Sequence, residues 1–319
     1  MLIENTKTYK GTEVETIFFR PTFCGKSAED LGIRVIYNMP MPTTVQVWSN
    51  PNKVLQSFES GWHGGANAVK LQKTIDMHKV KAESSFSAEE YFSMIFEKIV
   101  ADGSVSLGDL TGTELEKAET ELFRKAIAEG IRSTMWVGDE DGEISELTTF
   151  NGFLKSILNM GYNVGYRQLT DEDNIPGATE IFKICWGNAT DELKACRSEG
   201  QLAYFVSSDI YNSYIEELEE SNPTIPGVDL TASGTPLTYR GIPIVEIPLS
   251  KYRKDKCSTF CLLTDRRNLV LALNTSDMPE NEVRMWYNPD EMENRQRAVF
   301  LAGAEVIDQN LVSLCYSTF

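Results

Sequence analysis

The chain has 319 residues, of which 41% are hydrophobic and 24% are charged, and its formal net charge is −17. These fractions are ordinary for a folded protein, and the length suits one large domain or two smaller ones. So negative a chain argues against proteins that wrap nucleic acid, because phosphate contacts need Lys and Arg. Nothing approaches the roughly 18 consecutive apolar residues of a membrane-spanning helix. The acidic, non-apolar start MLIENTKTYKGTEVE does not predict a signal peptide, so we expect a cytoplasmic protein.

Cysteine and histidine are too scattered to predict a catalytic or metal site. The six cysteines form no CxxC pair, and we expect free, mostly buried thiols in place of disulfides. His63 and His78 have no partner ligand or nucleophile at a suitable spacing, and both are predicted to be ordinary surface residues. The Gly-rich residues 61–65 lack the ending of a phosphate-binding loop. We therefore predict no enzyme activity, no cofactor and no metal.

The N-terminal part of the chain predicts an arm followed by a hairpin. Residues 1–40 show little periodicity, which indicates an extended arm that packs elsewhere on the same chain or on a neighbour. Alternating apolar residues then predict strands around 44–47 and 69–77, separated by about 20 loop-like residues, an unusual length within a compact domain. We interpret residues 41–72 as an extended hairpin loop that reaches out from the body, or alternatively as a flexible surface insertion.

The longest helical pattern of the chain lies between Thr111 and Gly138, and small or apolar residues recur in it at steps of three and four. These residues are Leu115, Ala118, Leu122, Phe123, Ala126, Ile127, Gly130, Ile131 and Met135. Thr113 and Glu116 form a capping box at its start. A helix of about 22 residues would span roughly 33 Å. We expect the stripe to be core, so replacing Leu122 or Ile127 with Ala should cost about 2–5 kcal/mol.

The remaining elements alternate between helix and strand patterns. Before the long helix, Ser87 is predicted to start a helix that continues to Ile99. After it come an acidic turn and a short helix near Phe153. The middle of the chain predicts strands at 181–186 and 202–206, helices at 191–198 and 208–218, strand pieces on both sides of Gly241, and two strands about a turn at 265–268. A strand pair at 283–287 and 295–306 comes next, near the C-terminus.

In this order, the elements resemble the major capsid proteins of tailed bacteriophages, a fold shared with encapsulin nanocompartments. The resemblance covers about residues 40–319 and depends on the order of the elements. The segments GDEDG and NGFLKSI resemble the turn and the short helix that come after the long spine helix in this family. Leu237–Ile244 (LTYRGIPI) would supply its Leu-x-x-Gly-x-Pro-Val strand, with one more residue before the glycine and Ile244 in place of the valine. The resemblance implies an α+β fold with an N-terminal arm (1–40), an extended hairpin loop (41–72), a peripheral domain (73–155) with a spine helix (113–136), an axial domain (156–280) and strands that return to the peripheral domain (281–319).

The resemblance also implies a structural, non-enzymatic subunit of an icosahedral or prolate virus or prophage head. Such a subunit assembles with itself into pentamers and hexamers in the bacterial host cytoplasm and encloses double-stranded DNA in the virion without binding it specifically. Its other partners would be scaffold, portal and decoration proteins, with no membrane partner. The hairpin residues Trp48, Lys53, Phe58 and Trp62 are the predicted subunit interface. An encapsulin-like compartment and a cytoplasmic enzyme of unrecognised type are the alternatives.

The hairpin interpretation predicts that Trp62→Ala leaves the melting temperature of the unassembled subunit almost unchanged yet impairs assembly. The reason is that an aromatic anchor on a projecting loop contacts a neighbour and not its own core. Thermal unfolding of the subunit and electron microscopy of assembled particles measure the two effects. Unfolding of the Trp62→Ala subunit itself would mean that the loop belongs to the core.

Overall fold

The computed structural model describes residues 7–9, 28–38, 43–49, 60, 69–87, 114–143, 147–161, 165–169, 176–221, 237–249, 259–274, 283–288, 290–291 and 293–317. The described helices are α3 (Glu114–Val137), α4 (Phe153–Asn159), α5 (Ala178–Asn188), α6 (Asp191–Ala195) and α7 (Ser208–Ser221), with 3-10 turns η3 (Cys196–Glu199), η5 (Arg266–Asn268) and η6 (Gln309–Leu311). The first described strands are β1 (Lys7–Tyr9), β2 (Arg34–Tyr37), β3 (Thr43–Ser49), β4 (Val69–Ile75), β5 (His78–Ser87), β6 (Gly165–Gln168) and β7 (Leu202–Ser207). The later ones are β8 (Thr238–Tyr239), β9 (Ile242–Ile247), β10 (Phe260–Asp265), β11 (Leu269–Asn274), β12 (Val283–Asn288), β13 (Glu293–Val306) and β14 (Val312–Tyr316).

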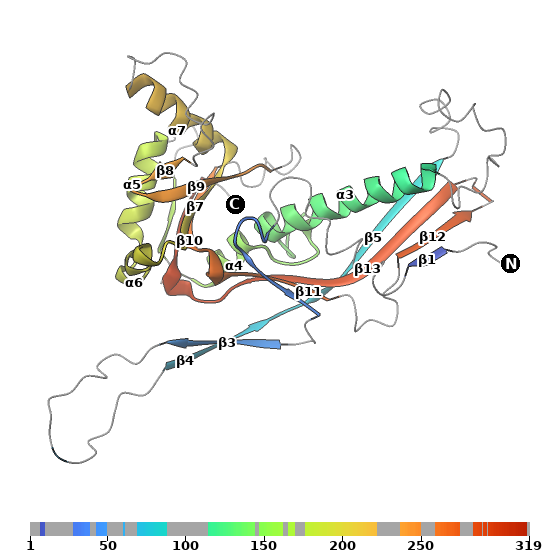
Figure 1. Ribbon diagram of the computed structural model, residues 1–319, viewed down its shortest axis with the longest axis horizontal. Coiled ribbons are helices and arrows are strands. Elements are labelled where there is room, and N and C mark those ends of the chain that lie inside the picture. Colours follow the sequence, from blue (N-terminus) through green and yellow to red (C-terminus); the bar gives the residue numbers. More distant parts are fainter. Residues whose placement is uncertain are drawn as a thin grey trace.

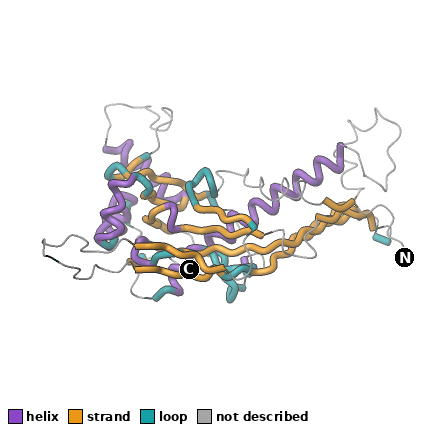
Figure 2. The backbone as a smooth tube through the Cα atoms, turned by 60° about the horizontal axis from the view of Figure 1, so that its bottom comes forward, coloured by secondary structure: helices purple, strands orange, loops and turns teal. Residues whose placement is uncertain are grey.

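The molecule is elongated, with a lobe at one end and a long arm at the other. Figure 1 shows α5, α6 and α7 gathered with the short strands in the lobe, while α3 and the paired strands β5 and β13 run toward the opposite end. Figure 2 shows that α3 lies to one side of these long strands along the arm. No helix in the described ranges is long and apolar enough to cross a membrane.

The arm is built on β13, a strand of 14 residues that would extend about 46 Å. One edge of β13 pairs with β5, and the other edge pairs first with β12 and then with β11. The predicted closing strand pair is thereby confirmed, with bounds 283–288 and 293–306. β1 and β2 extend the same sheet by pairing with β12 and β11, so two pieces of the expected N-terminal arm pack on their own subunit.

A second sheet, ordered β6-β14-β10-β7-β9-β8, forms the centre of the lobe. Its central strands are buried on both faces, which explains their unbroken apolar sequence. Alternate residues of β7 point to opposite sides: Phe205 joins the core that includes α3 and α4, whereas Tyr204 joins Phe182 of α5 and Tyr214 of α7. The ring centroids of Phe182 and Tyr204 lie 5.0 Å apart in an edge-on contact, a favourable aromatic geometry.

The described cysteines are free, as expected from the sequence. Cys185, Cys261 and Cys315 are fully buried in the lobe, and Cys261 lies directly opposite Cys315 on adjacent strands. The Sγ atom of Cys185 lies 3.3 Å from the carbonyl oxygen of Ser313, to which it donates a weak hydrogen bond. Burial raises the pKa of the Cys261 thiol well above its ordinary value, which keeps that thiol protonated.

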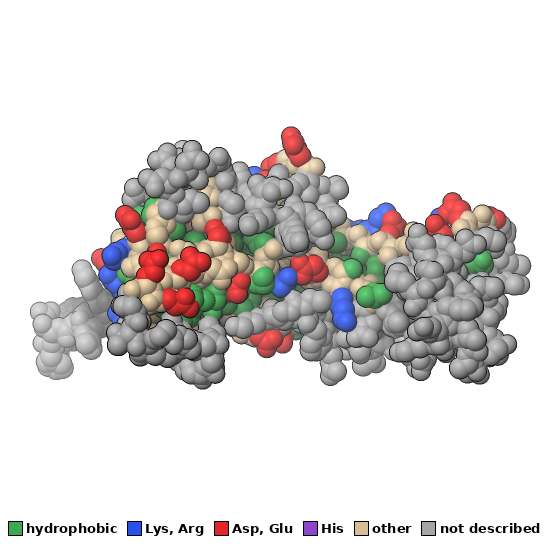
Figure 3. All heavy atoms as spheres, turned by 90° about the horizontal axis from the view of Figure 1, so that it is seen from above, with side chains coloured by type: hydrophobic (Ala, Val, Ile, Leu, Met, Phe, Trp, Pro, Cys, Tyr) green, Lys and Arg blue, Asp and Glu red, His purple; other side chains and the backbone are tan. Residues whose placement is uncertain are grey.

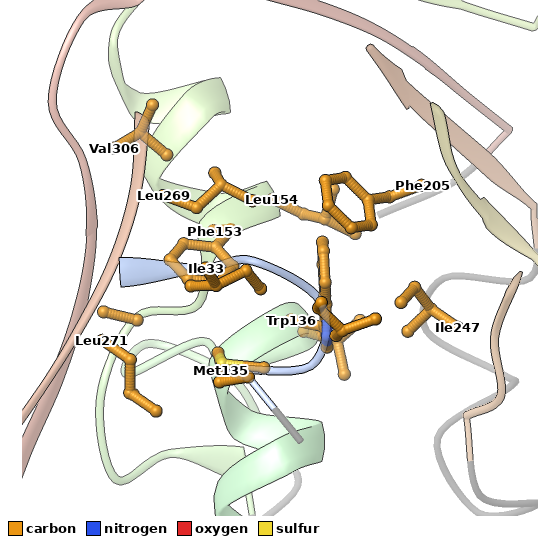
Figure 4. Packing of buried hydrophobic residues seen from close by; sticks show 14 of the residues in the cluster. Ile33, Met135, Trp136, Phe153, Leu154, Phe205, Ile247, Leu269, Leu271 and Val306 are labelled. Carbon is orange, nitrogen blue, oxygen red and sulfur yellow. The ribbon is translucent and has the colours of Figure 1, made fainter. Parts of the chain in front are cut away.

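The centre of the larger core is Trp136, which has no exposed surface. Its ring centroid lies 5.4 Å from that of Phe153, 5.2 Å from Phe205 and 6.1 Å from Phe260. Figure 4 shows Trp136 of α3, Phe153 of α4 and Phe205 of β7 converging, with Ile247 of β9 on another side of the indole. Burying one aromatic side chain against three elements therefore fixes the end of α3 on the lobe.

The apolar stripe of α3 is core along only part of its length. Phe123, Ile127 and Met135 are buried as predicted, and the helix bounds agree with the predicted spine helix to within a residue or two. The prediction is wrong for Leu122, which is 48% exposed, and for Ala126, which is also exposed. Both residues lie to one side of the buried stripe and face solvent, although their immediate neighbours Phe123 and Ile127 are buried.

Several sequence predictions need correction. Residues 181–186 form part of helix α5 and not a strand: Ala178, Ile181, Phe182 and Cys185 are buried at the spacing of one helix face. The predicted helix 191–198 is the short helix α6 followed by the 3-10 turn η3. Ser87 ends strand β5, and the rest of the helix predicted after it lies outside the described residues.

The chain passes between the two sheets more than once, which the predicted ranges do not anticipate. The strands on either side of residues 265–268 exist, but β10 belongs to the lobe sheet and β11 to the arm sheet. Likewise β14, within the predicted return strands 281–319, pairs with β10 and β6 in the lobe. Asp265 and Asn268 stabilise the first crossing, where Oδ1 of Asp265 accepts from the Arg267 amide at 2.8 Å and the Asn268 side chain donates to the Asp308 carbonyl at 2.9 Å.

The burial pattern of α3 predicts different costs for two similar substitutions. Ile127→Ala should lower the free energy of unfolding by about 2–5 kcal/mol, because Ile127 is 6% exposed within the core. Leu122→Ala is the matched control and should lower it by less than about 0.5 kcal/mol, because the side chain is already in solvent. Urea denaturation of the unassembled subunit measures both values. Equal losses would mean that Leu122 is also buried.

Candidate functional site

One of the four predicted interface residues, Trp48, lies on the described hairpin of β3 and β4. The backbone of Trp48 is part of β3 and pairs with Lys70, whereas Lys53, Phe58 and Trp62 lie outside the described residues. The hypothesis that these four residues form the subunit interface therefore stays a prediction. What the described residues define is the pair of strands that carries the loop and its attachment to the body.

β3 and β4 form a two-stranded ribbon that projects from the molecule. They pair antiparallel from Thr43 with Ile75 to Ser49 with Val69, and neither pairs with another described strand. Figure 1 shows the ribbon extending away from both the lobe and the arm. An isolated two-stranded ribbon is marginally stable in water, because it has little surface on which to bury side chains. A neighbouring molecule that covers this ribbon would therefore stabilise it.

The root of the ribbon is fixed to the arm sheet by a small apolar cluster. Val45, Ile75 and Met77 are at most 7% exposed and pack against Val270 and Leu301, among others, of β11 and β13. The backbone approaches closely here as well: a Cβ atom on Gly303 would lie 2.3 Å from the carbonyl oxygen of Asp76. Any larger residue at position 303 would push β13 away from the link between β4 and β5.

A half-open polar hollow of about 360 Å³ lies beside this root. It is bounded by the ribbon, β5, the segment after α3, α4 and β13. The lining residues are Lys73, Asp76, His78, Glu140, Phe150, Asn151, Ser156, Asn159, Met160, Ala304 and Glu305. The hollow is thus the place where the projecting ribbon meets the ends of α3 and α4.

His78 and Glu140 form the main polar contact across the hollow. Nδ1 of His78 lies 2.9 Å from Oε1 of Glu140, and both side chains are about one-third exposed. The other carboxylate oxygen of Glu140 accepts from Nδ2 of Asn151 at 3.0 Å, and Oδ1 of Asn151 accepts from the Glu140 amide at 3.1 Å. His78 is therefore not the ordinary surface residue expected from the sequence, because it joins β5 to the segment after α3.

Glu305 lies on the other side of the hollow, where its side chain is more buried than those of His78 and Glu140. Its side chain is 16% exposed, and Oε1 lies 3.5 Å from Nζ of Lys73 on β4. Burial raises the pKa of the Glu305 carboxyl above its ordinary value, and the Lys73 ammonium opposes this shift. The contact is an ion pair between the ribbon and β13, in a position where solvent screens it only partly.

The segment that carries Glu140 is held against the end of α3 by two glycines. The amide of Gly152 donates to the carbonyl oxygen of Gly138 at 2.9 Å, and the amide of Gly138 donates to that of Thr134 at 2.8 Å. A Cβ atom on Gly138 would lie 2.2 Å from the Phe150 carbonyl oxygen, and one on Gly152 would lie 2.6 Å from that of Thr134. The glycines of the GDEDG and NGFLKSI segments thus permit a close backbone return that larger residues would prevent.

The polar contacts of the hollow join separate segments of the chain: His78 contacts Glu140, and Lys73 forms an ion pair with Glu305. The described residues contain no cluster of three His, Cys, Asp or Glu side chains that could hold a metal ion. These contacts cannot be predicted from the sequence because their partners, such as His78 and Glu140, are far apart in the chain. Only the paired glycines give a local signal of them.

Comparisons with known proteins give a match at the level of the fold. No protein-family model and no curated protein sequence matches the chain. A chain of the satellite phage P4 procapsid that includes the size determination (Sid) protein is similar in structure, with a TM-score of 0.63 at 10% identity over 99% of this chain and 94% of that one. The capsid of an empty GTA particle gives 0.48 at 15% identity over 90% of this chain and 88% of that one. The capsid of Myoviridae phage XM1 gives 0.45 at 13% identity over 90% of each chain.

The match with the P4 procapsid chain covers almost the whole of both chains. Because the identity is only 10%, this similarity concerns the three-dimensional arrangement and not individual residues. The chain therefore has an α+β fold of the kind found in phage capsid proteins.

The buried position of Glu305 predicts a pH-dependent stability difference. A carboxyl whose pKa is raised by folding stabilises the fold fully below its unfolded pKa of about 4.3, and that stability is lost as the pH rises through the higher folded value. Glu305→Gln cannot ionise. Its melting temperature should match that of the wild type near pH 4 and exceed it by roughly 2–4 °C near pH 8.

Thermal unfolding of the unassembled subunit across this pH range measures the difference. Glu143→Gln, at an exposed position, is the control and should follow the wild type at every pH. A Glu305→Gln subunit that is less stable than the wild type near pH 8 would show that the ion pair with Lys73 outweighs the burial of the carboxylate.

Proposed function

We propose that the chain is a structural subunit of an icosahedral or prolate virus or prophage head, which assembles into pentamers and hexamers around double-stranded DNA. The observation that carries the proposal is the agreement with the P4 procapsid chain over 99% of this chain. The function itself is inferred from the fold. Two features of the subunit, its projecting ribbon and its charge, support this step independently.

The ribbon supports the proposal because it needs a partner. β3 and β4 project without pairing with another described strand, and the described apolar contacts of the ribbon lie at its root. A protein that works alone gains nothing from such an extension, whereas in a closed shell each ribbon lies against a neighbouring subunit that buries it. The ribbon loop with Trp48, Lys53, Phe58 and Trp62 is accordingly the proposed contact with the neighbour.

The net charge of −17 also suits a container for DNA. A negatively charged shell repels the phosphate backbone, so the genome is enclosed without adhering to the wall and leaves it freely. We propose that the subunit acts without catalysis, that it is made in the host cytoplasm and resides in the virion, and that its further partners are scaffold, portal and decoration proteins. Binding of DNA by specific contacts, or association with a membrane, is not part of this function.

The proposal predicts that the purified protein forms closed shells or curved sheets of ring-shaped capsomers. Negative-stain electron microscopy of the protein, expressed alone and with the products of neighbouring genes, tests this outcome. Nuclease-protected DNA inside the shells would identify a virus head, whereas enclosed protein would identify an encapsulin-like compartment. A small discrete oligomer under every condition would contradict the shell function and favour an enzyme.

A shortened ribbon is the matched control. Joining Ser49 to Val69 through an Asn-Gly turn keeps the paired strands and removes the loop, since these two residues are directly opposite each other. The shortened subunit should fold with the same melting temperature as the wild type but fail to form shells. Shells of normal appearance from this variant would contradict the role of the loop.

A further inference from the structure

The outer edge of the lobe carries two arginines stacked on one tryptophan. The guanidinium carbon of Arg240 lies 5.8 Å from the ring centroid of Trp186 and 5.5 Å from that of Tyr239, and the guanidinium carbon of Arg197 lies 6.0 Å from Trp186. These distances are in the range of cation–π contacts. We call Arg197, Arg240 and Trp186 the basic edge. The indole provides a flat support that holds two like charges close together.

The backbone presents Arg240 in an uncommon conformation. Arg240 and Gly241 form the two-residue turn between β8 and β9, and their φ angles are +52° and +76°. Such turns usually contain Asn-Gly, because positive φ is unfavourable for a long side chain. An arginine at this position therefore has a conformational cost, which its contacts with Trp186 and Tyr239 offset in part.

Neither arginine of the basic edge has a carboxylate partner within the part of the chain that the structure describes. Both side chains are exposed. Arg267, in contrast, binds Glu199 and Asp265 at 2.5 and 2.6 Å. Two exposed guanidinium groups that share one aromatic support form a fork for an incoming carboxylate, because their planar N–H donors match its two oxygens.

The same lobe carries acidic side chains that lack a cation. Glu216, Glu219 and Glu220 lie on one face of α7, are exposed, and form no ion pair with another described residue. Glu217 differs, because its carboxylate accepts from the Thr179 amide at 3.0 Å. We call Glu216, Glu219 and Glu220 the acidic helix face. Figure 3 shows Asp and Glu side chains gathered over the top of the lobe and Lys and Arg side chains at its outer left edge.

We propose that the basic edge of one subunit binds the acidic helix face of the next subunit in the same ring. This inference depends on the proposed function and names the contact that closes the capsomer. Two different, complementary patches on one chain form a head-to-tail contact, and a repeated head-to-tail contact closes a ring. Because the charges lie near the surface, the contact sets the relative position of neighbouring subunits but contributes little of the total binding free energy.

Charge reversal on either patch should abolish shell formation. The edge variant carries Arg197→Glu and Arg240→Glu, and the helix variant carries Glu216→Lys, Glu219→Lys and Glu220→Lys. Each alone places like charges in every contact of the ring, which opposes assembly. Combining all five substitutions in one chain restores opposite charges in every contact, so this combined variant should form shells again.

A mixture of the edge variant and the helix variant gives a sharper test. If the two variants alternate around a ring, the acidic edge of each edge-variant copy meets the basic helix of a helix-variant copy. The basic edge of each helix-variant copy then meets the acidic helix of the next edge-variant copy. Alternation closes only in rings with an even number of members. The mixture should therefore recover hexamers and hexamer sheets but not pentamers or closed icosahedral shells.

A further variant separates assembly from folding. Arg240→Asn removes one guanidinium group but places a residue that tolerates positive φ in the turn. Its subunit should be at least as stable as the wild type in thermal unfolding, yet assemble less. Electron microscopy and sedimentation measure assembly for all variants.

The outcomes distinguish this inference from the proposed function. Wild-type shells together with normal shells from the edge variant would overturn the inference alone, and so would a combined variant that forms no shells. Wild-type protein that never forms shells would overturn both. Pentamers in the mixture of variants would also contradict the head-to-tail contact.

Discussion

Trp136 holds the two halves of the molecule together. The indole occupies the end of α3 and packs against Phe153 of α4 and against Phe205 and Phe260 of the lobe sheet. Together with Phe123 and Ile127 nearer the middle of α3, this contact sets the direction of the helix relative to the lobe. The close backbone approach of Gly138 and Gly152 removes the remaining freedom, because the segment after α3 cannot move without a clash.

The two sheets are joined by the chain itself as well as by packing. β10 leads directly into β11 of the other sheet, and β13 returns through η6 to β14 of the lobe. Two hydrogen bonds hold the two crossings together: Nδ2 of Asn268 donates to the carbonyl oxygen of Asp308, and the Asp308 amide donates to Oδ1 of Asn268. The lobe and the arm are therefore connected as one unit. The β3–β4 ribbon pairs with no other described strand and is attached to this unit through its root. This division suits a subunit that has fixed contacts on its body and an adaptable contact on its ribbon.

The elements that could be predicted from the sequence are those in which the pattern of apolar residues is long or regular. α3 was located to within a residue or two, and the buried strand β7 and the β12–β13 pair were also found, because each contains a clear apolar pattern. The overall fold was inferred from the order of these elements, and the agreement with the P4 procapsid chain confirms it. The short apolar run 181–186 was misread as a strand, because a helix that is buried on most sides has no alternation to reveal it.

The contacts that the sequence did not reveal are those between distant segments. Ala82 pairs with Ala298, and His78 contacts Glu140, yet neither pair leaves a local signal. The exposure of Leu122 likewise depends on which side of α3 the rest of the fold covers, and the helix sequence alone does not show this. The loop residues Lys53, Phe58 and Trp62 lie outside the described part of the chain, so the predicted interface remains a hypothesis.

The cysteines of the lobe have a consequence for where the protein can persist. Cys185, Cys261 and Cys315 are buried among apolar neighbours, and burial keeps the Cys261 thiol protonated. A protonated thiol without access to solvent reacts slowly with oxidants and with other thiols. Burial therefore shields these three thiols from oxidants in solution. The packing around these cysteines is therefore the same in reducing and in oxidising surroundings.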